Sequence, residues 1–271
     1  SSLMMTIPSN SDADTSGSYF TNFADDASVQ FGQGEEFYVQ WRQRFSPEFL
    51  NTYYIGGGGW KQAIIGQGDR PGCFTGNAGE CASSCTNLEI VTQNTYQNGF
   101  PQMYHSCGAK DGQYEPLSQP LPPFDFKLQN AMPFPYCLYS NSAGCFKYNA
   151  SQWMTFQVHV KIGTPYQSPV PPVYNHDSTI ELWIAEEGQP SKLVMNYTPN
   201  PAPDACHLAN LGVSIPSCNT GYDLFNDNPT LKKYGKVHLL PYHTGKDSSQ
   251  IHPTGYTWYD ELIISRNQIA D

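Results

Sequence analysis

The chain has 271 residues, of which 39 % are hydrophobic, 14 % aromatic and only 14 % charged. Its formal net charge of −10, from 14 basic and 24 acidic residues, argues against non-specific binding of nucleic acid, which needs a basic surface. No apolar run is long enough to span a bilayer, so we expect no membrane insertion. An anionic substrate remains compatible with these values, because a local basic groove can lie on an acidic protein.

The N-terminal part begins with small polar residues and continues into alternating segments. We expect residues 1–18 to form a flexible arm and residues 19–271 to form a single domain. Residues 36–45, EFYVQWRQRF, alternate strictly between apolar and polar, which predicts a β-strand with one buried face. A short strand over 60–65 follows a run of glycines and carries Lys61. The polar face of 36–45 carries Tyr38, Gln40, Arg42 and Arg44.

The next part of the chain is rich in cysteine, proline and glycine, and predicts long ordered loops. An even number of cysteines without a zinc-binding spacing indicates four disulfides and an oxidising compartment; buried free thiols are the alternative. We therefore expect a secreted protein whose signal peptide has been removed. Local pairs such as Cys137–Cys145 and Cys206–Cys218 are the expected pairings. The eight cysteines are Cys73, Cys81, Cys85, Cys107, Cys137, Cys145, Cys206 and Cys218.

Residues 153–163, WMTFQVHVKIG, form the most regular strand pattern in the sequence. One face is wholly apolar and predicts contact with the core. The other face combines an aromatic ring, an amide, an imidazole and an ammonium group, which suits the floor of a binding groove; a half-exposed strand with mixed polar residues is the alternative. This second face carries Trp153, Thr155, Gln157, His159 and Lys161.

The C-terminal part predicts further strands over 178–185, 192–197, 234–242 and 256–265. The first of these places Trp183 opposite its apolar residues, and the third carries His238 and Tyr242. No amphipathic helix and no repeat of fixed period is evident. Many alternating strands separated by irregular loops indicate an all-β sandwich or barrel.

Three of these segments resemble strands of the concanavalin A-like jelly-roll superfamily. They are WMTFQVHV at 153–160, IELWIA at 180–185 and YDELIIS at 259–265. The resemblance implies an all-β, two-sheet antiparallel jelly-roll β-sandwich, here with long disulfide-stapled loops. It covers about half of the chain.

One local motif resembles a more specific group within that superfamily. Gln157-Val158-His159 is similar to the Q-[IV]-H motif of jelly-roll alginate lyases, and the overall pattern is equally similar to glucuronan lyase and heparin lyase-like jelly rolls. The resemblance implies that His159 abstracts a proton together with a tyrosine, while arginine and glutamine neutralise the carboxylate of a uronic acid.

β-Elimination in a uronate polymer needs a neutraliser of the carboxylate, a base for the C5 proton and an acid for the leaving oxygen. We expect a polysaccharide lyase with His159, Tyr242, Arg44 and Gln157 as catalytic residues. A glycoside hydrolase using two carboxylates, with Glu181, Glu186, Asp260 and Glu261 available, and a non-catalytic, lectin-like carbohydrate-binding domain are the alternatives. The expected substrate-binding residues are Arg42, Tyr38, Gln40, Lys161, Trp183, His238 and Lys61.

The remaining expectations concern ions and partners. The partner is a polysaccharide or oligosaccharide, and we expect a monomer without a cofactor or a catalytic metal. An oxygen-rich cluster suits a structural Ca²⁺, although the same residues favour an ordinary turn. The cluster contains Asp223, Asn226, Asp227 and Asn228.

Overall fold

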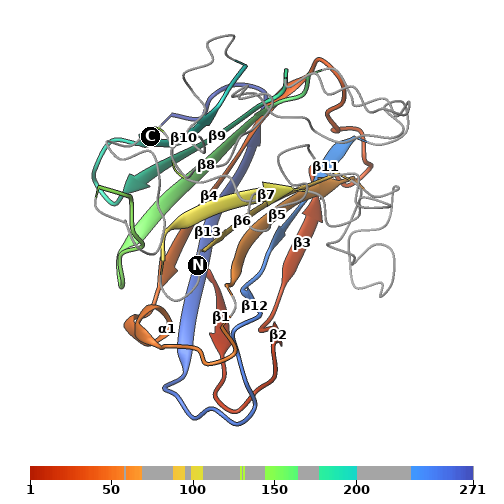
Figure 1. Ribbon diagram of the computed structural model, residues 1–271. Helices are drawn as coiled ribbons and strands as arrows, with labels where there is room; N and C mark the ends of the chain where they lie inside the picture. The colour runs from red at the N-terminus through yellow and green to blue at the C-terminus, as the bar shows by residue number, and fades with distance from the viewer. Residues whose placement is uncertain are drawn as a thin grey trace, which may run out of the picture.

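The computed structural model describes residues 1–57, 59–68, 88–94, 99–105, 129, 131, 144–163, 177–199 and 233–270. These residues form two large antiparallel sheets, a two-stranded ribbon and one short helix (Figure 1). The predicted all-β architecture with two antiparallel sheets is therefore confirmed. Within the same ranges, no helix combines the length and the apolar character that a bilayer crossing requires.

The larger sheet has six strands in the order β1-β13-β4-β8-β9-β10, and every neighbouring pair is antiparallel. Its two longest strands, β4 and β13, coincide closely with the alternating segments of the sequence. Its members are β1 (Leu3–Ile7), β13 (Gly255–Ser265), β4 (Glu36–Phe45), β8 (Trp153–Lys161), β9 (Thr179–Glu186) and β10 (Lys192–Tyr197).

The second sheet has five strands in the order β3-β11-β5-β6-β7, again antiparallel throughout. Beside it lies the ribbon of β12 (Tyr242–His243) and β2 (Asp14–Thr15). The five strands are β3 (Tyr19–Asn22), β11 (Tyr234–Leu239), β5 (Lys61–Gln67), β6 (Glu89–Asn94) and β7 (Pro101–His105).

The N-terminal segment differs from the expected flexible arm. Residues Leu3–Ile7 form β1, which pairs with β13, so the first and last strands of the chain lie side by side (Figure 1). Met5 and Ile7 are buried in the common core, which explains why the segment is ordered. Alternation of exposed and buried residues in LMMTI was the signal for this strand.

The core lies between the inner faces of the two sheets. Phe37, Trp41 and Phe156 from the six-stranded sheet belong to the same buried cluster as Ile65 and Val237 from the five-stranded sheet. Burying one such side chain stabilises the fold by about 1.5–3 kcal/mol. The alternating polar residues of both sheets are thereby placed on the two outer faces of the sandwich.

A polar network crosses this core and joins the two sheets. Gln43 on β4 accepts hydrogen bonds through Oε1 from Trp41 Nε1 at 3.2 Å and from Gln62 Nε2 at 3.1 Å. Its Nε2 donates to Thr257 Oγ1 on β13 at 3.0 Å, and the Tyr148 hydroxyl donates to Gln62 Oε1 at 2.6 Å. Because both glutamines are fully buried, these partners replace the hydrogen bonds that water would supply.

The short helix α1 (Pro47–Asn51) closes one end of the sandwich. Ser46 caps it, since its Oγ accepts a hydrogen bond from Phe49 N at 3.2 Å, and Pro47 occupies the first helical position. The same Oγ accepts a second hydrogen bond from Tyr256 N at 3.1 Å, which attaches the helix to β13.

The predicted disulfides and the predicted oxygen-rich cluster fall largely outside the described residues. Cys145 is the one cysteine within them, and it is disulfide-bonded. The other seven cysteines and residues 223–228 lie outside the described ranges. The four bridges and the Ca²⁺ site therefore stay predictions.

Candidate functional site

The candidate site residues from the sequence are divided between the two outer faces of the sandwich. The structure places Lys61, His238 and Tyr242 with the five-stranded sheet and its ribbon. The other eight lie on the outer face of the six-stranded sheet. These eight are Tyr38, Gln40, Arg42, Arg44, Gln157, His159, Lys161 and Trp183.

The polar faces of β4 and β8 share one side of the six-stranded sheet. Tyr38 is the cross-strand partner of His159, and Gln40 is the partner of Gln157. Tyr242, however, lies in the ribbon beside the five-stranded sheet and packs against Ile64 and Val91 on the outer face of that sheet. Because stacked sheets lie about 10 Å apart and these side chains point outward from both, His159 and Tyr242 cannot act on one sugar unit. The expected pairing of these two residues is therefore corrected.

His159 is held between two carboxylates. Its Nδ1 lies 2.8 Å from Glu181 Oε2, and its Nε2 lies 2.8 Å from Glu36 Oε1. The Tyr38 ring stacks on the imidazole with centroids 4.4 Å apart and planes 6° apart. A general base needs a free lone pair within reach of the substrate, and this buried ring offers none. The geometry corrects the expected role of His159 to a structural one that connects β4, β8 and β9.

Gln157 is similarly engaged in contacts within the protein. Its Nε2 donates to Gln40 Oε1 at 2.8 Å and to the backbone oxygen of Ile269 at 2.9 Å. The chain after β13 thus returns over β8 and covers the middle of this face. An amide whose donors are already used in this way does not neutralise a substrate carboxylate, so the expected role of Gln157 is not supported by its contacts.

Arg42 also has partners within the protein, whereas Lys161 is exposed at the end of β8. The two terminal nitrogens of Arg42 each lie 3.4 Å from a carboxylate oxygen, one of Glu187 and one of Glu261. In the middle of the outer face of the six-stranded sheet, the His159 ring nitrogens, the Gln157 amide donors and the Arg42 guanidinium are therefore already paired within the protein, so this area is not an open catalytic groove.

The outer face of the five-stranded sheet carries a different arrangement, a row of polar side chains that crosses its strands. Gln102 on β7 pairs with Gln93 on β6, and Gln93 pairs with Lys61 on β5. Trp60, one position earlier, bridges to His243, so the register brings Lys61 beside Tyr242. The Lys61 ammonium nitrogen lies 5.3 Å from the centre of the Tyr242 ring. We call Gln102, Gln93, Lys61 and Tyr242 the Lys61 row.

A second, largely apolar row supports the Lys61 row on the same face. Ile64, Val91 and Leu240 form a buried cluster against which Tyr242 packs. His238 is the cross-strand partner of Ile64 and stacks on Phe20 with ring centroids 5.3 Å apart. Because Tyr242 packs against this cluster, its ring is held in position within the Lys61 row, as a binding or catalytic surface requires.

Burial changes the protonation of two groups on this face. It lowers the pKa of His238 to about 3, with a further contribution from the nearby Lys236 ammonium, so this imidazole is neutral near neutral pH. Burial also lowers the pKa of Lys61 from its ordinary value of 10.5, and the negative charge of Glu89 opposes part of that effect. A lysine with a depressed pKa has a larger fraction of free amine and can accept a proton.

The number and position of carboxylates on this face test whether the protein is a glycoside hydrolase. On the described strands of the five-stranded sheet, Glu89 is the one carboxylate, and it is 1 % exposed. On the neighbouring ribbon, the Asp14 carboxylate is ion-paired with the Lys246 ammonium group. A glycosidase of the usual kind needs two carboxylic groups across a groove. The Lys61 row therefore offers an amine, a phenol and two amides rather than a carboxylate pair.

The sequence had indicated Lys61, His238 and Tyr242 but not the two glutamines. The pattern EIVTQN in β6 places Gln93 on the face opposite Ile90 and Thr92, and PQMYH in β7 does the same for Gln102 relative to Met103. Both positions could have been found by extending the alternation argument to these shorter strands.

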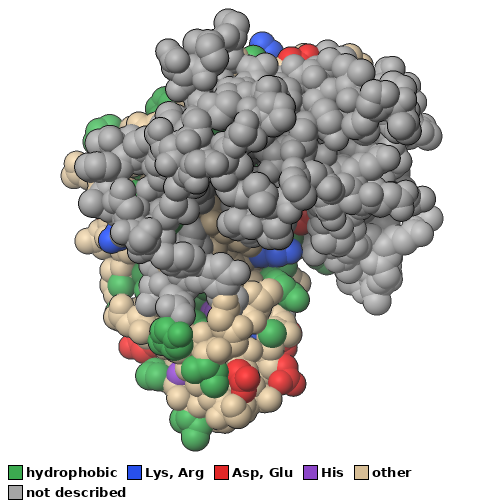
Figure 2. All heavy atoms as spheres, in the orientation of Figure 1, with side chains coloured by type: hydrophobic (Ala, Val, Ile, Leu, Met, Phe, Trp, Pro, Cys, Tyr) green, Lys and Arg blue, Asp and Glu red, His purple; other side chains and the backbone are tan. Residues whose placement is uncertain are grey.

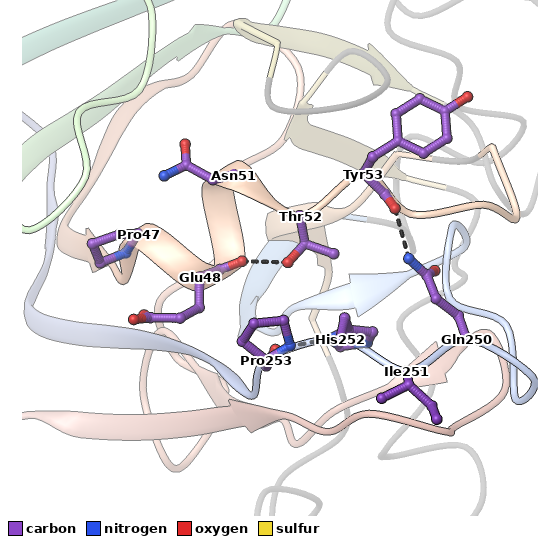
Figure 3. Close-up of a pocket in the computed structure, with 9 residues that line it drawn as sticks. All are labelled: Pro47, Glu48, Asn51, Thr52, Tyr53, Gln250, Ile251, His252 and Pro253. Carbon is purple, nitrogen blue, oxygen red and sulfur yellow. Dashed lines mark hydrogen bonds between the residues drawn. The ribbon is translucent and has the colours of Figure 1, made fainter.

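A shallow depression of about 410 Å³ lies at the α1 end of the sandwich. Figure 2 shows hydrophobic, acidic and histidine side chains exposed together at this end of the molecule. Figure 3 shows Glu48 directed away from His252, and Gln250 held by its hydrogen bond to the Tyr53 backbone oxygen. The one carboxylate and the one imidazole of the lining thus do not face each other, and the depression is not an acid–base site.

Comparison with known proteins places these observations in a wider context. No family model matches the chain, and no curated protein matches it. Among solved structures, the chain is similar to an endo-β-1,4-glucuronan lyase from the fungus Trichoderma reesei, with 12 % identity, a TM-score of 0.47, and coverage of 97 % of this chain and 80 % of that one.

Two further solved structures represent different activities. The marine PL-14 alginate lyase from Aplysia kurodai has 13 % identity and a TM-score of 0.45, with coverage of 88 % of this chain and 72 % of that one. The catalytic domain of the glycoside hydrolase family 131 protein from Coprinopsis cinerea has 9 % identity and a TM-score of 0.38, with coverage of 95 % and 83 %. At these values the function has to be argued from the residues of this chain.

Proposed function

We propose that this chain is a secreted polysaccharide lyase that cleaves a uronate-containing polymer by β-elimination at the Lys61 row. The observation that carries the proposal is the position of Lys61, an amine with a lowered pKa, beside the Tyr242 phenol and the Gln93 amide. These are the three kinds of group that the reaction needs: a base, an acid and a hydrogen-bond donor for the carboxylate.

The roles follow from the chemistry of each group. The deprotonated amine of Lys61 takes the proton from C5 of the uronate, while Gln93 and Gln102 donate hydrogen bonds to the uronate carboxylate and stabilise the charge that develops there. The C4–O bond breaks as the C4–C5 double bond forms. The Tyr242 hydroxyl gives its proton to the leaving oxygen. No oxidant, reductant or second substrate is needed.

The choice of lyase over hydrolase rests on the shortage of carboxylates on the described strands of this face. The compartment belongs to the same proposal, since eight cysteines, of which Cys145 is disulfide-bonded, suit an oxidising environment. A monomer acting on a polysaccharide or oligosaccharide remains our expectation.

The test is an assay on a panel of alginate, glucuronan, glycosaminoglycan, pectate and neutral polysaccharides. Ultraviolet absorbance of the unsaturated product and new reducing ends are followed together. Both signals on an acidic polymer identify a lyase, whereas reducing ends alone identify a hydrolase. Binding without either signal identifies a lectin-like module. The last two outcomes would each overturn the proposal.

Substitutions then test the catalytic role of each residue. Lys61→Met and Tyr242→Phe are each expected to lower the rate by a factor of about 10² or more, the usual scale for loss of a general base or acid. Lys192→Met is the matched control, because this exposed lysine lies on β10 of the other sheet. Full activity in a folded Lys61→Met variant would remove Lys61 from the mechanism.

A further inference from the structure

The outer face of the six-stranded sheet carries a row of large side chains that the Lys61 row does not use. Strand register places Met4 on β1 opposite Trp258 on β13, Trp258 opposite Arg44 on β4, and Arg44 opposite Trp153 on β8. Tyr256 stacks on Trp258 with centroids 5.9 Å apart. The row spans three interstrand spacings, or about 14 Å. We call Met4, Trp258, Arg44 and Trp153 the Arg44 row.

Arg44 is held between the two indole rings. Its guanidinium carbon lies 4.3 Å from the centre of the Trp258 ring and 5.6 Å from that of Trp153. This arrangement aligns the plane of the guanidinium and limits its rotamers. A cation that is already oriented loses less conformational entropy when a ligand binds.

The charge of Arg44 has no counterpart in the described part of the chain. Arg42 and Arg266 each lie within 4.0 Å of a glutamate, whereas no carboxylate of the described residues pairs with Arg44. Its Nε is buried and makes no hydrogen bond within those residues. Its two terminal nitrogens, in contrast, are not among the buried unpaired atoms, so an acceptor from outside can reach them.

The neighbouring charges do not occupy Arg44 either. Glu187 and Glu261 both lie 3.4 Å from Arg42, and the Asp260 carboxylate accepts a hydrogen bond from the Glu261 backbone. These three acidic groups are therefore engaged with other partners.

The Arg44 row is also open, unlike the middle of the same face. Met4 at its edge is 53 % exposed, and Trp153, Trp258 and Tyr256 all retain exposed surface. Partly exposed aromatic side chains beside an arginine without a carboxylate partner in the described residues combine stacking surface with a bidentate donor. A carboxylate-bearing pyranose chain fits both features, because its ring faces stack and its carboxylate accepts two parallel hydrogen bonds.

We propose that the Arg44 row is a second, non-catalytic binding surface for an acidic polysaccharide, on the face opposite the Lys61 row. Arg44 binds a uronate carboxylate, and the indole and phenol rings contact the neighbouring sugar rings. Such a surface holds a polymer on the protein independently of the site that cleaves it. The proposal stands apart from the proposed lyase activity, since it needs only binding.

The experiment uses the full chain carrying Lys61→Met, so that ligands stay intact. Binding of alginate, glucuronan and polygalacturonate oligosaccharides, and of the same oligosaccharides with their carboxyl groups reduced, is measured by calorimetry. Arg44→Gln is expected to weaken binding of the best acidic ligand by about tenfold or more, the effect of losing charge-assisted hydrogen bonds. The carboxyl-reduced ligand should bind at the weaker level in both proteins.

Two further variants make the result decisive. Met4→Glu places a repelling carboxylate at the exposed edge of the row, where it does not disturb the core, and should also weaken acidic ligands. Lys192→Gln removes one positive charge from the same sheet and should leave binding as it was. If Arg44→Gln and Met4→Glu bind like the parent, or if Arg44→Gln lowers only thermal stability, the Arg44 row is a structural ladder and the proposal fails. Loss of lyase activity alone does not affect this outcome.

Discussion

Replacing Gln43 by leucine tests whether the polar network in the core is a necessary connection between the sheets. The substitution removes the acceptor of two fully buried donors, Trp41 Nε1 and Gln62 Nε2. Each orphaned donor costs about 1–3 kcal/mol, and additional apolar burial of leucine offsets about 1 kcal/mol. We therefore expect the free energy of unfolding to fall by about 3 kcal/mol, a large share of the total for a typical domain.

Gln62→Leu is the matched comparison, and it should cost less, about 1 kcal/mol. The Tyr148 hydroxyl would lose Gln62 Oε1 but could still donate to the Gln93 backbone oxygen, which lies 3.3 Å away. Gln43 Oε1 would keep Trp41 as its donor. No buried donor is therefore left without an acceptor by this change.

The assay is equilibrium unfolding in guanidinium chloride without reductant, followed by tryptophan fluorescence. The double variant should lose less stability than the sum of the single variants, because it lacks one of the two donors that Gln43→Leu orphans. An equal or larger cost for Gln62→Leu, or strict additivity, would refute this account of the network.

Two further predictions concern stability. The hydrogen bond from His159 is the main cause that lowers the pKa of Glu181 from its ordinary value of 4.5, so the stabilisation it provides is complete above about pH 4.5 and is lost as the pH falls through the folded-state value. The melting temperature of the parent and of Glu181→Gln is measured from pH 6 to pH 3, and it should fall less steeply with decreasing pH in the variant. Equal dependence of the melting temperature on pH in the two proteins would contradict this role of Glu181. Ser46→Ala removes the hydrogen-bond acceptor for both Phe49 N and Tyr256 N, so we expect the free energy of unfolding in denaturant to fall by about 1–2 kcal/mol. An unchanged free energy of unfolding would show that the cap does not stabilise the fold.

One prediction concerns activity and pH together. Because burial lowers the pKa of Lys61 below 10.5, the rate of the proposed elimination should rise with pH and level off below that value. A rate that is flat or falls over this range would exclude a lysine base. The substitutions at Lys61, Tyr242 and Arg44 described above complete the set.

The sequence predicted the strands well because alternation is a local property. The bounds of 36–45 and 192–197 agree with β4 and β10, and β8 lies within 153–163. The N-terminal strand was missed because only two of its five residues are buried, so that its pattern is short and weak.

The site was predicted less well, for a physical reason. Lys61 and His159 both lie on the outer, more polar faces of their strands. Nothing in the local sequence shows whether the polar side chains of such a face are available to a ligand or already hydrogen-bonded within the protein. The two carboxylates that contact the His159 ring nitrogens come from β4 and β9. The backbone oxygen that accepts a hydrogen bond from Gln157 comes from residue 269. Such contacts depend on the order and register of strands distant in sequence, which a local pattern does not determine.

The position of β13 between β1 and β4 has a consequence for how the chain is made. Gln43 and Thr257, which meet in the network, are 214 residues apart in the chain. During synthesis β1 and β4 leave the ribosome long before the strand that joins them, so the edges of β1 and β4 that pair with β13 stay unpaired until residues 255–265 have emerged. A topology dominated by such distant pairings folds slowly and exposes edges that can aggregate. We therefore expect the yield of folded protein to depend more on the last strand, Gly255–Ser265, than on any other segment of similar length.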